Sequence, residues 1–365
     1  MLEIHKEIVN LISAGKPAAL ATLISSRGSA PRKAGAKMLI RQDETFIGTV
    51  GGGGVELQTC HKAVEIMESG EPQLVHFDLA GKDCVAQMIC GGQVDVFLEV
   101  RLKDNPDTLK IHREIVNLVS KGEAVVLATV ISSRGSTLRK AGVKMLIRRD
   151  DTVIGSLGGD GVEQQIRHKA AEVLRHAEPE MVYFDPAGKE LAAKTVTEGQ
   201  VAIFMEPILP PATLYLCGAG HISQSTAAIG KILGFQVVVI DPRPEFNNAE
   251  RFPDADSRII DDYALSIPKL NMGEEGHIVI CTPGHILDEQ CLYFAVATKA
   301  KYIGMIGSKK KVKETKEHLI QKGVPPEQLD RVHAPIGLEI GAETPAEIGI
   351  SILAEIIKVR RAAGG

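Results

Sequence analysis

Residues 4–48 read IHKEIVNLISAGKPAALATLISSRGSAPRKAGAKMLIRQDETFIG, and residues 111–155 read IHREIVNLVSKGEAVVLATVISSRGSTLRKAGVKMLIRRDDTVIG. The two stretches align without an insertion at an offset of 107 residues, and the alignment continues to the pair GGQVDVFLE (91–99) and EGQVAIFME (198–206). A match of this length indicates a tandem duplication. Two copies are too few for a solenoid, so we expect two small domains that pair with each other.

Each copy has the pattern of a mixed α/β module. In the first copy, Ile4, Ile8 and Leu11 mark one face of a helix that ends at Gly15. The rest predicts a strand (18–24), a hairpin (37–41 and 45–50), a second helix (55–67) and a closing strand (93–99). Polar or proline-containing linkers at 101–108 and 209–211 predict three domains: two modules at 1–102 and 109–208, and a third domain at 212–365.

The third domain begins with LYLCGAGHIS (214–223), which reads as a strand, a glycine turn and a helix. Gly218 and Gly220 fill the first two positions of GxGxxG, and Ser223 stands at the third. A second strand, FQVVVID (235–241), ends in an acid, as in dinucleotide-binding folds. Further strands alternate with helices, so we predict a doubly wound parallel sheet of the Rossmann type.

The composition excludes several classes of protein. The chain has 44% hydrophobic and 24% charged residues, as in globular proteins, and its formal net charge of -4 disfavours nucleic-acid binding. The charged N-terminus does not read as a signal peptide, and no apolar stretch is long enough for a membrane span. The six cysteines form no CxxC pair, which argues against structural zinc and iron–sulfur clusters. We therefore expect a cytoplasmic protein with reduced thiols and no metal site.

Differences between the copies suggest where a site lies. GSAPRKAG (28–35) becomes GSTLRKAG (135–142), GGGGVE (51–56) becomes GGDGVE (158–163), and ICGGQV (89–94) becomes VTEGQV (196–201). The second copy has thus lost Pro31, Gly53 and the Cys90–Gly91 pair, all at loop positions. This clustered loss favours a binding site on the first copy, with the second copy as scaffold.

The loops of the first copy carry residue types suited to an anionic ligand. Glycines between a strand and a helix allow close backbone approach, and the basic residues of the other loop could contact phosphate or pterin oxygens. The candidate cofactor-binding residues are Ser29, Arg32, Lys33, Lys37, Gly51, Gly52, Gly53, Gly54, Glu56, Cys90, Gly91 and Gly92. The simpler alternative is a tight turn with an acid favoured by the helix dipole, beside a solvated basic loop. Cys90 is a candidate catalytic thiol, against the alternative of a buried small hydrophobe.

The third domain offers a second set of candidates. Asp241 could accept a hydrogen bond from a ribose hydroxyl, and Arg243 could accommodate a ribose phosphate. Gly218, Gly220 and His221 form the phosphate loop, where His221 could be a ligand contact or a proton donor. Ser308 and Lys309 start a helix after a strand and could hold an anion, although a solvated basic helix start explains them equally well.

Together these motifs resemble the XdhC/CoxI family. GSAPRKAGAKM, GTVGGGGVE and ICGGQV resemble its N-terminal domain, while LCGAGHIS, VVVIDPRPEFNNAERFPDAD, YIGMIGSKKK and APIGLEIGAETPAEIGISILAEII resemble its Rossmann domain. The resemblance implies an accessory protein for xanthine dehydrogenase-like molybdenum hydroxylases. Such a protein would bind molybdenum cofactor (molybdopterin), support its sulfuration and deliver it to the apo-enzyme. We also expect a cysteine desulfurase as a partner and assembly of the chain into a homo-oligomer.

Two departures from the family pattern matter. The family commonly has cysteine in GGGCVE, where this chain has Gly54 and, in the second copy, Gly161, so no role of that thiol carries over. The duplicated N-terminal domain also differs from the layout that the resemblance leads us to expect. Two other functions stay open: an NAD(P)-dependent oxidoreductase and a nucleotide-sensing regulatory protein.

Overall fold

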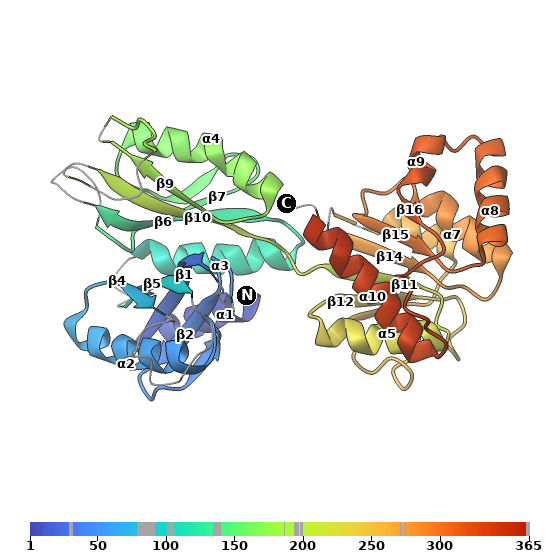
Figure 1. Cartoon of the computed structure of the whole chain (residues 1–365), viewed down its shortest axis with the longest axis horizontal. Helices are drawn as coiled ribbons and strands as arrows, with labels where there is room; N and C mark the ends of the chain where they lie inside the picture. The colour runs from blue at the N-terminus through green and yellow to red at the C-terminus, as the bar shows by residue number, and fades with distance from the viewer. Residues whose placement is uncertain are drawn as a thin grey trace. The chain divides into compact units, whose positions relative to one another are not determined.

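The computed structural model describes residues 1–28, 32–78, 92–100, 106–133, 140–185, 187–192, 197, 200–270, 272–273 and 275–362. The chain forms two compact units, Met1–Pro210 and Pro211–Gly365 (Figure 1). The first unit holds two modules with separate antiparallel sheets, and the second holds one parallel sheet. The predicted fold class is confirmed.

The first module is a five-stranded sheet covered by a long helix. Its strands are β1 (Ala18–Arg27), β2 (Lys37–Arg41), β3 (Phe46–Gly48), β4 (Gln73–Asp78) and β5 (Gln93–Glu99), in the order β3-β2-β1-β5-β4. Helix α2 (Gly53–Ser69) packs Val55, Ala63 and Ile66 against one face of this sheet. No sequence pattern predicted β4, because Leu74 places an apolar residue on the exposed face of this edge strand and so obscures the alternation of apolar and polar residues.

The second module repeats this arrangement. Its strands are β6 (Val125–Ser133), β7 (Lys144–Ile147), β8 (Val153–Gly155), β9 (Glu180–Phe184) and β10 (Val201–Ile208), in the equivalent order β8-β7-β6-β10-β9. Helix α4 (Asp160–His176) covers its sheet as α2 covers the first.

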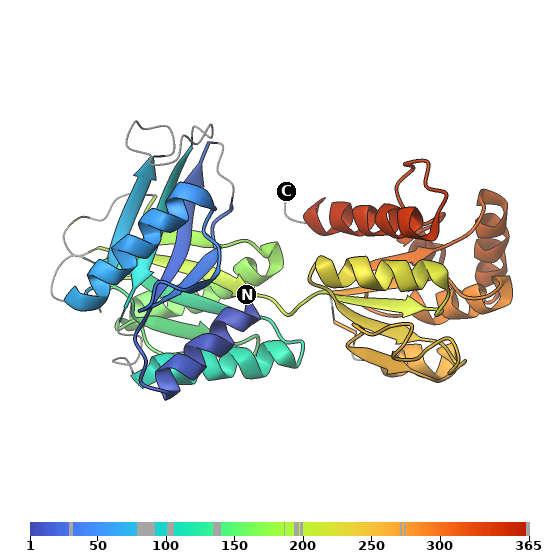
Figure 2. The ribbon, with the colours of Figure 1, turned by 90° about the horizontal axis from the view of Figure 1, so that it is seen from below.

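The two modules pair through equivalent surfaces. Ile24 and Phe97 of the first module form one apolar cluster with their counterparts Ile131 and Phe204. Helices α1 (Leu2–Ser13) and α3 (Pro106–Ser120) pack side by side, as both ribbon views show (Figure 2). Because residues 107 positions apart face one another, the first unit has approximate two-fold symmetry.

The second unit has six parallel strands in the order β13-β12-β11-β14-β15-β16. Helices α5 and α10 pack together on one face, and α7 and α8 cover the other (Figure 2). The order of strands reverses between β11 and β14, which is where such sheets bind ligands. The bounds are β11 (Thr213–Cys217), β12 (Gln236–Ile240), β13 (Ser257–Ile259), β14 (Gly276–Ile280), β15 (Tyr302–Met305), β16 (Val332–His333), α5 (His221–Ile232), α6 (Tyr263–Ser266), η1 (Ile267–Lys269), α7 (His285–Ala295), α8 (Lys309–Gln321), α9 (Pro326–Asp330) and α10 (Pro345–Ala362).

Among the described residues, no helix combines the length and the apolar character that crossing a bilayer requires.

Candidate functional site

Lys37, a predicted ligand contact, is instead a structural residue. Its Nζ lies 2.8 Å from Glu206 of the second module and donates to Thr22 Oγ1 at 3.0 Å, and only 2% of its side chain is exposed. Lys144 makes the equivalent bond to Glu99 at 2.7 Å. The sequence prediction for Lys37 was wrong because its position beside a glycine-rich loop does not reveal that it points into the contact between the modules.

The glycine run begins α2, but Glu56 has a capping role. Its Oε1 accepts the Gly52 backbone N–H at 3.0 Å and the Thr49 hydroxyl. Glu163 makes a similar pair of bonds in the second module: its Oε1 accepts the Ser156 hydroxyl and the backbone N–H of Gly158, one residue before the counterpart of Gly52. Since both copies share this arrangement, it explains the glutamate as a helix cap and not as a ligand contact.

The glycines of this run have backbone reasons to be glycine. Gly51, Gly52 and Gly53 all have positive φ, at 149°, 80° and 54°. In the second module, a Cβ at Gly161 would lie 2.9 Å from the Ala187 carbonyl oxygen. The cysteine that the resemblance leads one to expect at that position would therefore clash in the second copy.

The other predicted contacts of the first module fall into three groups. Arg32 and Lys33 are exposed, and Lys33 lies 3.6 Å from Glu178 of the second module. Gly92 is buried just before β5. Ser29, Pro31, Cys90 and Gly91 lie outside the described residues.

The structure identifies a polar cluster that the sequence reasoning missed. Asp95 on β5 accepts the Ser25 hydroxyl at 2.5 Å through Oδ2, and its Oδ1 lies 2.6 Å from His76 Nδ1 on β4. Strand β1, which carries Ser25, ends at Arg27, five residues before Arg32. The carboxylate at Nδ1 orients the imidazole and leaves Nε2 available to a ligand. The side chain of His76 is 56% exposed, so a ligand can reach it.

Comparison of the copies could have found this cluster. The second copy replaces His76 by Tyr183 and Asp95 by Ala202, so both partners have changed together. An exposed ion pair of this kind contributes only about 0–1 kcal/mol to stability, which gives a weak structural reason for keeping it. The cluster therefore strengthens the case for a ligand site on the first copy.

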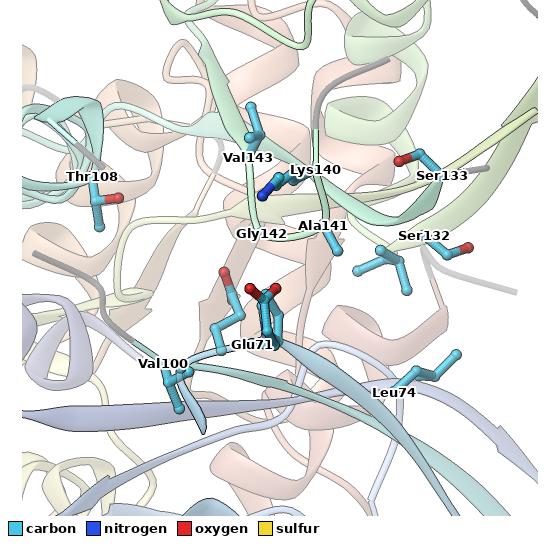
Figure 3. Close-up of a pocket in the computed structure, with 14 residues that line it drawn as sticks. Glu71, Leu74, Val100, Thr108, Ser132, Ser133, Lys140, Ala141, Gly142 and Val143 are labelled. Atoms are coloured by element: carbon cyan, nitrogen blue, oxygen red, sulfur yellow. The ribbon is translucent and has the colours of Figure 1, made fainter. Parts of the chain in front are cut away.

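A cavity of about 660 Å³ lies between the modules. Figure 3 shows Glu71 and Leu74 on the first module's side, and Lys140 on the loop of the second module above them. Ser132, Ser133 and Thr108 add hydroxyl groups to the walls. Leu74 and His76 lie on the same face of β4, two residues apart, so the cavity adjoins the polar cluster.

In the second unit, the predicted phosphate loop is a tight turn between β11 and α5. Gly218 has φ 108°, and a Cβ there would overlap the Cys281 carbonyl oxygen, so only glycine fits. Gly220 caps α5, whose first residue, His221, is exposed.

Asp241 is less available to a ribose than its position in the sequence suggests. It is fully buried, its Oδ2 accepts the Ala219 N–H at 2.8 Å, and Arg243 binds both of its oxygens at 2.8–3.0 Å. Burial by itself would raise the pKa of Asp241, but the bonds from Arg243 and Ala219 outweigh it and lower the pKa. The carboxylate therefore anchors the phosphate loop, and Arg243 is occupied by the same contact.

At the neighbouring strand ends, Ser308 caps α8 by accepting the Lys311 N–H at 3.2 Å, and Lys309 is exposed. Lys311 itself is bound to the buried Asp288 at 2.5 Å, which also accepts from Thr282. Capping and this buried ion pair account for Ser308 and Lys311 without an anion.

Three of the described thiols are poor nucleophiles. Burial raises the pKa of Cys60, Cys281 and Cys291 above its usual range. In the part of the chain that the structure describes, no group of three or more His, Cys, Asp and Glu could hold a metal ion.

Comparison with known proteins gives two family matches. The model of the XdhC and CoxI family matches residues 11–78 and again 118–185, and that of the XdhC Rossmann domain matches residues 214–356.

Three curated relatives are similar to this chain. YqeB of Escherichia coli, an uncharacterized protein, is 30% identical over 259 residues, which cover 70% of this chain but only 47% of YqeB. The chain thus spans about half the length of that relative. A Bacillus subtilis protein described as a probable xanthine dehydrogenase subunit is 25% identical, covering 98% of this chain and 97% of its own length. PaoD of E. coli, a molybdenum cofactor insertion chaperone, is 22% identical, covering 96% and 86%.

A crystal structure from Bacillus halodurans, described as a xanthine dehydrogenase, superposes with a TM-score of 0.76 at 25% identity and covers 98% of this chain and 96% of its own. The alignments with this structure and with the B. subtilis relative run through both modules. The expectation that the duplicated layout is a departure was therefore wrong.

Proposed function

The chain belongs to the XdhC and CoxI family, and from this membership we propose that it is an accessory protein for a molybdenum hydroxylase of the xanthine dehydrogenase type. In this proposal it binds molybdenum cofactor as cargo, holds it while sulfur is added, and delivers it to the apo-enzyme. The match of both modules and the Rossmann domain carries the proposal, supported by the similarity to a molybdenum cofactor insertion chaperone.

The polar cluster of the first module suits the cargo. Asp95 fixes the ring of His76, whose Nε2 can contact a metal centre or accept a hydrogen bond. Arg32, which is exposed and follows the end of β1, adds positive charge that suits an anionic cofactor. In this proposal sulfur comes from a partner such as a cysteine desulfurase, and Cys60, Cys281 and Cys291 are poor sulfur carriers because burial raises the pKa of their thiols.

A nicotinamide-dependent oxidoreductase is a weaker candidate. The strand order and the Gly218 turn favour a nucleotide at the second unit, but the Asp241 carboxylate that would contact a ribose is already bound by Arg243 and Ala219. Nucleotide sensing would need only an accessible phosphate-binding loop. The N-terminus of α5, where His221 is exposed, offers such a loop, so nucleotide sensing is the second function to test.

The test begins with the purified chain and molybdenum cofactor released from a donor enzyme. Equilibrium dialysis measures binding of the cofactor, and addition of an apo molybdenum hydroxylase measures delivery as recovered activity. We expect saturable binding and faster activation than by free cofactor. A chain that binds no pterin cofactor, yet binds NAD(P)H and oxidises it with an added acceptor, would overturn the proposal.

A further inference from the structure

We propose that the cavity between the two modules is the seat of a 2-amino-4-oxopyrimidine ring that carries a phosphate, the chemistry shared by pterin cofactors and guanine nucleotides. The choice of the pterin as its natural occupant rests on the proposed function. The inference makes the second module a wall of the binding site and not only a scaffold.

The two modules contact each other on two equivalent sides, and the facing acidic and basic side chains are paired on only one of them. Glu71 and Lys140, both within the described residues, line the cavity and form no ion pair with each other. Their counterparts on the other side, Glu178 and Lys33, lie 3.6 Å apart. The duplication thus provides two versions of one surface, one in which an exposed ion pair joins the two charges and one in which they form no such pair.

The first module also contributes an apolar residue to the wall of the cavity. Leu74 lines the cavity with half of its surface exposed. Its counterpart Met181 packs onto the central cluster with Ile24 and Phe97. An exposed leucine in a cavity offers a flat ring an apolar contact that the other side has filled with its own side chain.

The equivalent buried carboxylates Glu99 and Glu206 also differ between the two sides. Glu99 lines the cavity while one of its oxygens holds Lys144 at 2.7 Å. In the equivalent Glu206, the oxygen Oε2 is enclosed and has no hydrogen-bond partner among the described residues. The side that holds the cavity therefore presents a second carboxylate, whose position is fixed by a buried ion pair, to whatever occupies the cavity.

The chemistry of these walls defines the ligand class. A carboxylate accepts two hydrogen bonds from the amino group and ring N–H of a 2-amino-4-oxopyrimidine, and an ammonium binds phosphate. Glu71 and Lys140 supply these groups from opposite modules (Figure 3). Leu74 and Ile131 supply apolar surface for the ring faces, and a volume of about 660 Å³ is in the range of small-molecule sites.

The experiment uses the full chain with two probes, metal-free molybdopterin and GMP, and measures Kd by equilibrium dialysis. Glu71→Gln removes the charged acceptor without changing size, and Leu74→Trp fills the cavity from an exposed position that tolerates a larger side chain. Glu178→Gln is the matched control on the equivalent side, where Glu178 is paired with Lys33. Circular dichroism and thermal melting establish that each variant is folded.

We expect Glu71→Gln to raise the Kd of the bound probe at least about tenfold, Leu74→Trp to abolish binding, and Glu178→Gln to change Kd less than about twofold. Lys140→Ala should raise the Kd of GMP more than the Kd of guanosine, because only GMP carries a phosphate.

The outcomes separate the two proposals. Unchanged molybdopterin binding in folded Glu71→Gln and Leu74→Trp variants would show that the cavity is not the binding site, and it would leave the proposed function intact. GMP binding that both variants lose, together with no molybdopterin binding by the wild type, would support the seat and contradict the proposed function. Binding of neither probe would overturn both.

Discussion

Acidification from pH 7.5 to 5.5 should destabilise the first unit through two buried histidines. His5 on α1 and His112 on α3 meet on the approximate two-fold axis with their Nδ1 atoms 2.8 Å apart. Both side chains are fully buried, and each Nε2 has no hydrogen-bond partner within the described part of the chain. One Nδ1 donates to the other, so the hydrogen bond is lost when both rings are protonated, because no acceptor then remains.

The folded state resists protonation of this pair. Burial, together with the charges of His112 and Lys37, holds the pKa of His5 well below its usual range. Burial, with Lys144 and Lys37 nearby, lowers the pKa of His112 to about 3. The unfolded chain binds both protons near pH 6.5, so stability is full above that pH and is lost as the pH falls below it.

The size of the effect follows from the unfolded state alone. At pH 5.5 an imidazole with an ordinary pKa gains about 1.4 kcal/mol from protonation in the unfolded chain, while the buried ring gains almost nothing. The pair should therefore cost the first unit about 3 kcal/mol of unfolding free energy between pH 7.5 and 5.5.

The assay is urea unfolding at both pH values, read by hydrogen exchange in peptides from α1 and α3. His5→Gln/His112→Gln should lose about 3 kcal/mol less unfolding free energy than the wild type over this interval, because glutamine does not titrate. His61→Gln/His168→Gln, at equivalent exposed positions of α2 and α4, is the control for removing two imidazoles. A difference below about 1 kcal/mol between the wild type and the His5/His112 variant would refute the reasoning.

Three further predictions concern single residues. Lys37→Met should cost about 3–5 kcal/mol of unfolding free energy in urea, because it leaves the Glu206 carboxylate buried without its partner, and Glu206→Leu in the same chain should recover most of the loss. Gly218→Ala should lower stability by about 2–4 kcal/mol and weaken any nucleotide binding measured by calorimetry, because its Cβ would meet the Cys281 carbonyl oxygen; equal stability would contradict the geometry. Cys281 should stay unmodified by iodoacetamide at pH 7.5 in the folded chain and react in urea, as peptide mass spectrometry can measure, because burial raises the pKa of its thiol.

The sequence alone determined the architecture of this protein. The repeat at an offset of 107 residues predicted two paired α/β modules, and the Gly218 turn between a strand and a helix predicted the parallel sheet. These predictions succeeded because periodicity and turn chemistry act between residues that are close along the chain. Edge strand β4 was missed because Leu74 on its exposed face obscures this signal.

The tertiary structure alone decided which side chains are available to a ligand. Lys37 and Lys33 lie four residues apart in one basic stretch, yet one is buried against Glu206 and the other is exposed. His76 and Asp95 became a cluster only when β4 and β5 paired. Availability depends on which faces meet across modules and strands, and those contacts join residues that are distant in sequence, so no local pattern records them.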